Sequence, residues 1–297
     1  MQRFCPAKIN LCLQVGPLRV DGFHELFSVV APLALGDTLQ AERLAERGRI
    51  ELLVEGADVP ADATNLVWRA AEAFWQEVEP SGGVRFTLRK EIPVGAGLGG
   101  GSSNGTQALR AMEELFGVVL EDAVRLRLAA RLGSDCPLFL ADGPVIFQGR
   151  GEIIRPLDHT FRESLRGLPV AVVKPPFGVA TGWAFAAWRA SPGATGAGED
   201  PLVWRQEWAA GAANLDKLAD LPGNALTRVV GQKYPALPVG QRLLREELGW
   251  NWQMSGSGSA GFILLPAGAT TAEKDRLRHL LESTWGPGSF AMFTELS

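Results

Sequence analysis

The 297-residue sequence lacks the features that mark membrane, secreted or nucleic-acid-binding proteins. No apolar run approaches the roughly 20 residues of a membrane helix, and the opening Met-Gln-Arg-Phe-Cys-Pro has no apolar signal core. The net charge of −4 gives no overall positive field for nucleic acid. The three cysteines form no Cys-x-x-Cys pair and are odd in number, which argues against a zinc knuckle and a disulfide framework. We therefore expect a cytoplasmic protein with reduced thiols, without a membrane or nucleic-acid partner.

The composition is that of a globular protein, with 46% hydrophobic and 21% charged residues. The length predicts about two domains of ordinary size. Alternating and helical patterns both occur along the chain, so we predict an α+β fold.

The stretch Pro93 to Asn104 contains five glycines between a strand-like and a helix-like run. Glycine tolerates positive φ and has no Cβ, so successive N–H groups can converge on a phosphate. The following helix, which we expect to end at Gly117, adds its unpaired first-turn donors and the positive end of its dipole. The stretch therefore predicts an anion-binding loop.

Three other interpretations of this loop are weaker. Gly95, Gly97 and Gly100 satisfy Gly-x-Gly-x-x-Gly, but Pro93 separates them from the strand and no second strand with a terminal acidic residue follows. A Walker A loop has a lysine between its last glycine and the following serine or threonine. Here Ser102 follows Gly101 directly, so this lysine is absent. A flexible linker would rarely lie between two well-patterned elements.

Candidate residues elsewhere each have a plain structural alternative. Lys8 and Asn10 share one face of the alternating stretch Cys5 to Val15, and a lone lysine there could simply face solvent. A lone histidine such as His24 is more often a structural or surface residue than a catalytic base or a residue that recognises a ligand. Asp135 lies just before Pro137 and could cap a helix.

Local patterns also predict several elements in detail. A helix is expected from Asn65 to Val78, with Thr64 or Asn65 as its cap, and another from Thr271 to Trp285. The serine- and glycine-rich stretch Ser255 to Ala260 lies between two strand-like runs, so its backbone is expected to approach a ligand. Ser191 to Asp200 has no periodicity and is expected to form a surface excursion.

Five separated motifs, taken together, resemble those of the kinase superfamily named for galactokinase, homoserine kinase, mevalonate kinase and phosphomevalonate kinase (GHMP). They are Pro-Ala-Lys-Ile-Asn-Leu, Asp-Gly-Phe-His-Glu-Leu, Pro-x-Gly-x-Gly-Leu-Gly-Gly-Gly-Ser-Ser, Leu-Gly-Ser-Asp-Cys-Pro-Leu-Phe and Met-Ser-Gly-Ser-Gly-Ser-Ala. The resemblance implies a two-domain GHMP-kinase-like fold with the active site in the cleft between the domains. Gly-Arg-Gly-Glu, at residues 149–152, resembles the family's Gly-x-Gly-Glu that precedes the second domain, which implies an ATP-binding domain at residues 1–155 and a substrate-binding domain at residues 156–297. This sequence departs from the family's motifs at two positions: Phe23 replaces the commoner tyrosine, and Ala225 replaces a common aspartate.

The resemblance also implies roles for particular residues. Lys8 would stabilise the charge that develops at the reacting phosphate, and Asp135 would accept the proton of the substrate hydroxyl. Substrate contacts would come from Asn10, Phe23, His24, Thr181 and Phe185. ATP contacts would come from Asn65, Lys90, Pro93, Gly95, Ala96, Gly97, Leu98, Gly99, Gly100, Gly101, Ser102 and Ser103. Mg²⁺ would accompany ATP, with protein ligands that the sequence does not identify.

The implied activity is ATP-dependent phosphorylation of the 2-hydroxyl of 4-diphosphocytidyl-2-C-methyl-D-erythritol, a cytidine-diphosphate compound of the non-mevalonate isoprenoid pathway. The alternatives are another GHMP small-molecule kinase, of the mevalonate or homoserine type, and a non-catalytic nucleotide-binding relative. We expect a monomer or a weak homodimer.

Overall fold

The computed structural model describes residues 1–191 and 221–297. The chain forms two compact units built from discontinuous segments. Unit 1 consists of Met1–Lys8, Leu35–Val94 and Gly99–Asp142, and unit 2 of Ile9–Ala34, Gly95–Leu98 and Gly143–Ser297. The domain boundary expected after residue 155, and the cleft between the domains, stay predictions. Apart from Ser191, the excursion expected from Ser191 to Asp200 lies outside the described residues.

The strands of unit 1 form an antiparallel and a parallel pair. The two long strands β1 (Gln2–Leu18) and β2 (His24–Leu44) pair with each other and contribute residues to both units. Within unit 1, β2 pairs antiparallel with β4 (Gly83–Arg89), and β4 pairs parallel with β3 (Ile50–Glu55). Lys8 and Asn10 are buried, so β1 is not the solvent-facing edge strand that the alternation left open.

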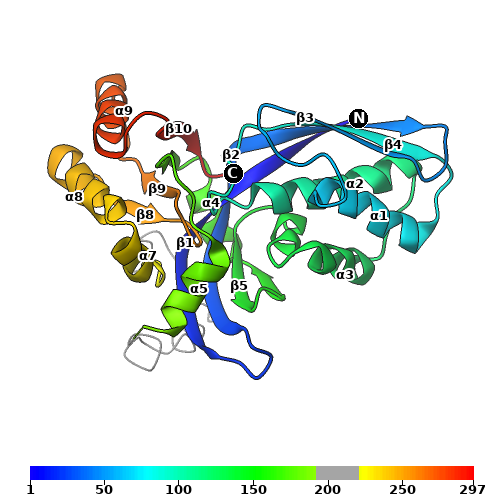
Figure 1. The fold of residues 1–297 in the computed structure, drawn as a ribbon, viewed down its shortest axis with the longest axis horizontal. Helices are drawn as coiled ribbons and strands as arrows, with labels where there is room; N and C mark the ends of the chain where they lie inside the picture. Colours follow the sequence, from blue (N-terminus) through cyan, green and yellow to red (C-terminus); the bar gives the residue numbers. More distant parts are fainter. Residues whose placement is uncertain (192–220) are drawn as a thin grey trace. The chain divides into compact units, whose positions relative to one another are not determined.

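Helices α1 (Leu66–Val78) and α2 (Gly100–Phe116) lie along one side of strands β3 and β4 (Figure 1). The shared core includes Phe74 of α1, Leu109 of α2 and Phe86 of β4. Helix α3 (Asp122–Leu132) and the short 3₁₀ helix η1 (Cys136–Leu140) complete the unit.

The helix ends of unit 1 follow the predicted capping. The Asn65 side chain accepts a hydrogen bond from the Val67 N–H group and begins α1, and Gly117 ends α2 in the left-handed conformation, at φ 65°.

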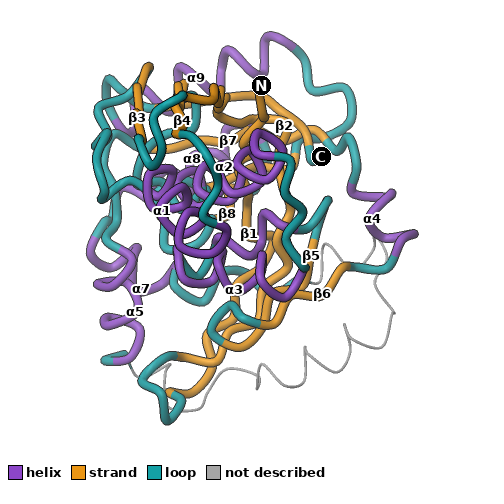
Figure 2. The backbone as a smooth tube through the Cα atoms, turned by 90° about the vertical axis from the view of Figure 1, so that its right-hand side faces the viewer, coloured by secondary structure: helices purple, strands orange, loops and turns teal. Residues whose placement is uncertain are grey.

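Unit 2 contains two groups of strands. The first part of β2 pairs antiparallel with β5 (Val145–Gly149), which pairs in turn with β6 (Ile153–Pro156), as Figure 2 shows. A separate antiparallel sheet has the order β10-β7-β9-β8. Its strands are β7 (Pro169–Lys174), β8 (Trp252–Met254), β9 (Gly261–Leu264) and β10 (Phe290–Glu295).

Unit 2 has a second core, which includes Val173 of β7 and Trp252 of β8. The described helices of unit 2 are α4 (His159–Leu165), α5 (Thr181–Arg189), α7 (Thr227–Lys233), α8 (Ala236–Leu248) and α9 (Thr271–Trp285). All of these helices other than α4 contribute to the second core. Helices and strands thus occur in both units, which confirms the α+β class. Among the described residues, no helix has the length and hydropathy of a membrane span.

Candidate active site

Lys8 and Asp135 form an ion pair within unit 1. The Nζ atom of Lys8 lies 3.6 Å from Oδ2 of Asp135. The lysine side chain is 6% exposed, whereas that of Asp135 is 36% exposed. The structure therefore brings the two predicted catalytic residues together, and the carboxylate stays accessible to a ligand.

Asp135 precedes η1, but its side chain makes no capping hydrogen bond in the described structure. The turn is held instead by Thr106 of α2, whose hydroxyl donates to the carbonyl of Cys136 at 2.7 Å. Burial raises the pKa of the Cys136 thiol to about 11, so this side chain acts as a small hydrophobic residue and not as a nucleophile. The helix-cap explanation of Asp135 therefore lacks the hydrogen bond that it requires.

The second half of the glycine loop becomes the first turn of α2. Gly99 precedes the helix with φ 71°, and in the described structure no side chain caps the first turn. Unpaired first-turn N–H groups form an anion-binding site. The Ser103 hydroxyl in this turn is buried and has no hydrogen-bond partner among the described residues.

Gly99 also makes room for the side chain of Lys8. A Cβ atom placed on Gly99 would lie 2.9 Å from Cγ of Lys8 and 2.8 Å from the ring of Phe139. Both distances are shorter than van der Waals contact, so only glycine lets the lysine stem lie against the loop.

The first half of the loop belongs to unit 2, where it contacts the serine- and glycine-rich loop Ser255 to Ala260. The Ser255 hydroxyl donates to the carbonyl of Gly97 at 3.2 Å, and the Ala260 N–H group donates to that of Ala96 at 3.2 Å. A Cβ atom on Gly97 would lie 2.5 Å from the Ser255 carbonyl oxygen. The backbone of the serine- and glycine-rich loop therefore lies close to Gly97. The approach of this loop to a ligand stays a prediction.

Side chains of unit 2 hold this serine- and glycine-rich loop in place. Asn224 donates to the carbonyls of Met254 and Gly256, at 2.9 and 2.7 Å. The Thr181 hydroxyl lies 2.9 Å from that of Ser257. Thr181, predicted as a substrate contact, therefore braces this loop.

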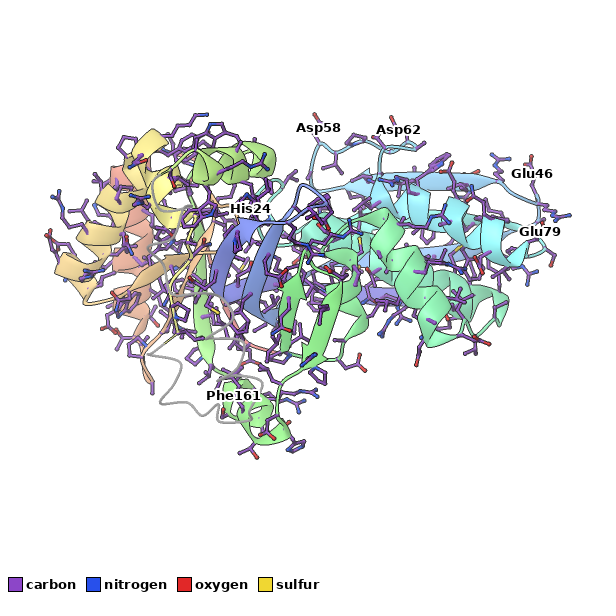
Figure 3. All side chains as sticks on the ribbon, turned by 90° about the horizontal axis from the view of Figure 1, so that it is seen from below. His24, Glu46, Asp58, Asp62, Glu79 and Phe161 are labelled. Carbon is purple, nitrogen blue, oxygen red and sulfur yellow. The ribbon has the colours of Figure 1, made fainter. Side chains whose placement is uncertain are left out.

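Three of the predicted substrate contacts, Phe23, His24 and Phe185, lie in unit 2, with His24 at the start of β2 (Figure 3). The Nδ1 atom of His24 lies 2.9 Å from the carbonyl oxygen of Gly16, and its Nε2 atom is buried without a hydrogen-bond partner in the described structure. The Phe185 ring stacks beside it, at 6.3 Å between centroids and 26° between planes. Phe23 is 53% exposed, with the Arg150 guanidinium 5.3 Å from its ring.

Three further predicted residues use their polar groups inside the protein. The Asn10 amide donates to the Ser28 hydroxyl at 2.8 Å. The Asn65 amide donates to the carbonyl of Pro60 at 2.7 Å. The ammonium of Lys90 pairs with Asp37 and donates to Oδ1 of Asn104 at 3.0 Å.

The sequence did not predict a role for Asp37, whose only signal is that it is an isolated acid in the apolar run Leu33 to Leu39.

The described residues contain no group of three or more His, Cys, Asp or Glu side chains that could hold a metal ion. Mg²⁺ usually binds through one or two carboxylates together with substrate phosphates, so it does not require such a group.

Comparison with known proteins agrees with this geometry. Residues 65–143, which include the glycine loop and Asp135, match the family described as "GHMP kinases N terminal domain". A crystal structure of a homoserine kinase from Cytophaga hutchinsonii is similar over 100% of this chain and 94% of its own, with a TM-score of 0.72 and 17% identity, which shows the fold alone. The fold and the loop define a small-molecule kinase of the GHMP class.

Closer relatives identify the family within that class. The 4-diphosphocytidyl-2-C-methyl-D-erythritol kinase of Pelotomaculum thermopropionicum is 38% identical over 258 residues, covering 87% of this chain and 86% of the relative. A crystal structure of 4-(cytidine 5'-diphospho)-2C-methyl-D-erythritol kinase matches over 100% of both chains, with a TM-score of 0.76 and 32% identity. The chain belongs to the family of 4-diphosphocytidyl-2-C-methyl-D-erythritol kinases.

Proposed function

We propose that this protein transfers a phosphoryl group from ATP to the 2-hydroxyl of 4-diphosphocytidyl-2-C-methyl-D-erythritol, in the non-mevalonate route to isoprenoid precursors. The observation that carries the proposal is the Lys8–Asp135 pair, with its accessible carboxylate, beside the glycine loop. Membership of the kinase family supports the same chemistry.

Phosphoryl transfer requires positioning and charge neutralisation more than covalent catalysis. Asp135 accepts the proton of the attacking hydroxyl, and Lys8 stabilises the negative charge on the transferred group. The loop from Pro93 to Ser103 binds the triphosphate through the backbone N–H groups of the residues after Pro93 and the positive end of α2.

Asn65 and Lys90 are proposed neighbours of the adenine. The polar end of each side chain already has partners within the protein. We therefore assign any adenine contact to their backbone and aliphatic stems.

Mg²⁺ fits the site as a companion of ATP. Asp135 supplies one accessible carboxylate, and Ser103 supplies a buried hydroxyl that has no partner in the described structure. When bound, the ion would neutralise charge on the phosphate oxygens. These two residues are the proposed protein ligands.

We propose that the cytosine is held between the rings of Phe23 and Phe185 and is recognised at its edge by His24, with Asn10 and Thr181 as neighbouring contacts. A carbonyl oxygen only accepts, so Nδ1 of His24 donates to Gly16, and Nε2 of the neutral imidazole is left as an acceptor. Cytosine presents an amino donor at position 4, whereas uracil presents an oxygen there. This arrangement favours cytidine over uridine.

The deciding experiment compares ADP release with the cytidine-diphospho substrate, mevalonate and homoserine. Only the first should be phosphorylated, and preferential turnover of either other substrate would contradict the proposal.

A second comparison tests base recognition with the uridine counterpart of the substrate. Wild type should prefer cytidine by about 5-fold to 150-fold in kcat/KM, equivalent to about 1–3 kcal/mol. His24→Ala should lose most of this preference, and His279→Ala, at an exposed helix position, should keep it. Equal use of both bases by wild type would exclude the role of His24.

The cellular setting is also a proposal. Three free, buried cysteines fit a reducing compartment such as the cytoplasm. We propose a monomer or a weak homodimer as the working form.

A further inference from the structure

Asp37 of β2 is a fully buried carboxylate surrounded by donors of unit 1. Its Oδ1 atom accepts hydrogen bonds from the N–H groups of Glu91 and Ile92, at 2.7 and 2.8 Å. Its Oδ2 atom accepts one from the Asn104 amide at 2.9 Å and pairs with the Lys90 ammonium. An ionised carboxylate offers about four acceptor sites. All of them are therefore used.

The four donors lie on both sides of the glycine loop. Lys90, Glu91 and Ile92 lead directly into Pro93, where the loop begins. Asn104 lies in α2, after the loop has ended. Lys90 also donates to Oδ1 of Asn104 at 3.0 Å, which closes the network. One buried carboxylate thus holds both the entry and the exit of the loop.

Packing adds a second connection at the same place. A Cβ atom on Gly100, the first residue of α2, would lie only 3.1–3.4 Å from side-chain atoms of Ile92. The backbone of Ile92 is the segment that Asp37 holds. The segment that follows β4 and the first turn of α2 are therefore held against each other.

A loop with five glycines needs such fixation, because glycine loses more conformational freedom on ordering than any other residue. If ATP itself had to order the loop, that cost would reduce its affinity. A loop held at both ends presents its N–H groups before the nucleotide arrives.

We propose that Asp37, Lys90 and Asn104, here called the loop clamp, are positioning residues that preorganise the glycine loop for the triphosphate of ATP. The inference rests on the proposed function in taking ATP as the ligand of the loop. The clamp acts through the loop backbone and touches no reacting atom. Its loss should weaken ATP binding and leave recognition of the cytidine substrate intact.

The main test variant is Asn104→Ala, which removes the hydrogen bonds of Asn104 to Asp37 and to Lys90 and keeps the Asp37–Lys90 pair and both backbone hydrogen bonds. We expect the Kd for ATP, measured by calorimetric titration, and the KM for ATP to rise about 10-fold. The KM for the cytidine-diphospho substrate should stay near the wild-type value. Asp37→Asn, which places amide hydrogens against two donors, should lower kcat/KM for ATP by about 10²-fold.

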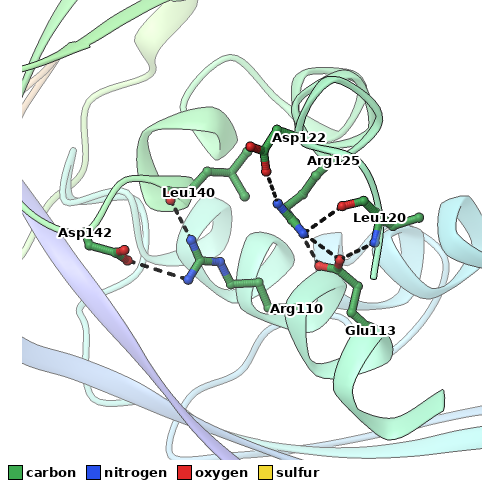
Figure 4. A network of polar contacts seen from close by, with 7 residues as sticks. All are labelled: Arg110, Glu113, Leu120, Asp122, Arg125, Leu140 and Asp142. Carbon is green, nitrogen blue, oxygen red and sulfur yellow. Dashed lines mark hydrogen bonds and ion pairs between the residues drawn. The ribbon is translucent and has the colours of Figure 1, made fainter. Parts of the chain in front are cut away.

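Glu113 provides a matched control in the same helix. Its carboxylate, 10% exposed, accepts hydrogen bonds from the Leu120 N–H group and twice from Arg125, at 2.8–2.9 Å (Figure 4). It lies nine residues after Asn104, or about 13 Å along the helix. Glu113→Gln should lower the thermal midpoint as the clamp variants do, but leave the Kd for ATP unchanged.

Two results would overturn the proposal. One is a folded Asn104→Ala protein with wild-type Kd for ATP. The other is an equal rise in Kd for Glu113→Gln, because the effect would then be one of general stability. If Asp37→Asn does not fold, the Kd of the Asn104→Ala protein for ATP still tests the proposal. Failure of the proposed function is distinguishable, because wild type would then bind ATP without phosphorylating the cytidine substrate.

Discussion

At the residue scale, the accessible carboxylate of Asp135 should matter for turnover and not for folding. Asp135→Asn keeps the size of the side chain and removes the proposed base, so kcat should fall by about 10²-fold or more, while the Kd for ATP measured without Mg²⁺ changes little. Steady-state kinetics and ATP titration measure the two quantities. Asp122→Asn, whose side chain is 99% exposed, is the control and should keep full activity. Near-normal turnover of Asp135→Asn would contradict a role of Asp135 as the base and would make it a structural residue.

The three buried thiols predict a pH dependence of stability. Burial raises the pKa of Cys5 and Cys12 to about 12 and that of Cys136 to about 11. Below about pH 8.5, the usual thiol pKa, folded and unfolded chains both keep their thiol protons. Above it only the unfolded chain loses them, so the free energy of unfolding should fall as the pH rises.

Urea titrations between pH 7 and 10 measure this decline. A thiol reagent at pH 8 should react slowly with the native protein and rapidly with all three cysteines in urea. Rapid reaction of one thiol in the native protein would contradict the raised pKa values.

Sequence reasoning identified the residues whose signal is local. Lys8, His24 and Asp135 lie in short motifs, and the structure pairs Lys8 with Asp135. Asp37 could not be found in this way, because it lies 53 residues from Lys90 and only the pairing of β2 with β4 brings them together. The same holds for Ser255, which contacts Gly97 across 158 residues.

At the element scale, the glycines of the loop should differ sharply in their tolerance of a side chain. Gly99 has φ 71° and its Cβ would meet Lys8 and Phe139, so Gly99→Ala should destabilise the fold by about 1–3 kcal/mol. Gly101 is helical with open space around a Cβ, so Gly101→Ala should stabilise by about 0.5–1 kcal/mol. Urea unfolding of both variants measures the difference. Equal stabilities would mean that the loop is not held in this conformation.

Element boundaries were predictable where capping residues mark them. Asn65 caps α1, Gly117 ends α2, and α9 runs from Thr271 to Trp285 as expected. The full length of β2 was not predictable, because Pro32 and Gly36 interrupt its β-forming residues. The strand order was also beyond local patterns, since the parallel pair β3–β4 is joined by a long connection that contains α1.

At the scale of the whole molecule, ATP should stabilise the folded chain against unfolding. A ligand that binds only the native state at 100 times its Kd contributes about 2.7 kcal/mol. Thermal unfolding with and without ATP measures this as a rise in Tm. AMP is the control and should give a much smaller shift at the same concentration, because it lacks the phosphates that the loop binds. An equal shift with AMP would assign the affinity to the adenosine part.

The interleaving of the two units has a consequence for protein synthesis. Unit 2 needs Ile9–Ala34, made early, together with Gly143–Ser297, made last. At about 5–20 residues per second, the ribosome needs on the order of 10 to 50 s after Ala34 to finish the chain. For the first part of that time, until Val145–Gly149 has been made, the first part of β2 lacks its partner β5 and exposes unpaired N–H and C=O groups on that edge. The nascent chain is therefore a natural client for chaperones that shield strand edges until β5 is available.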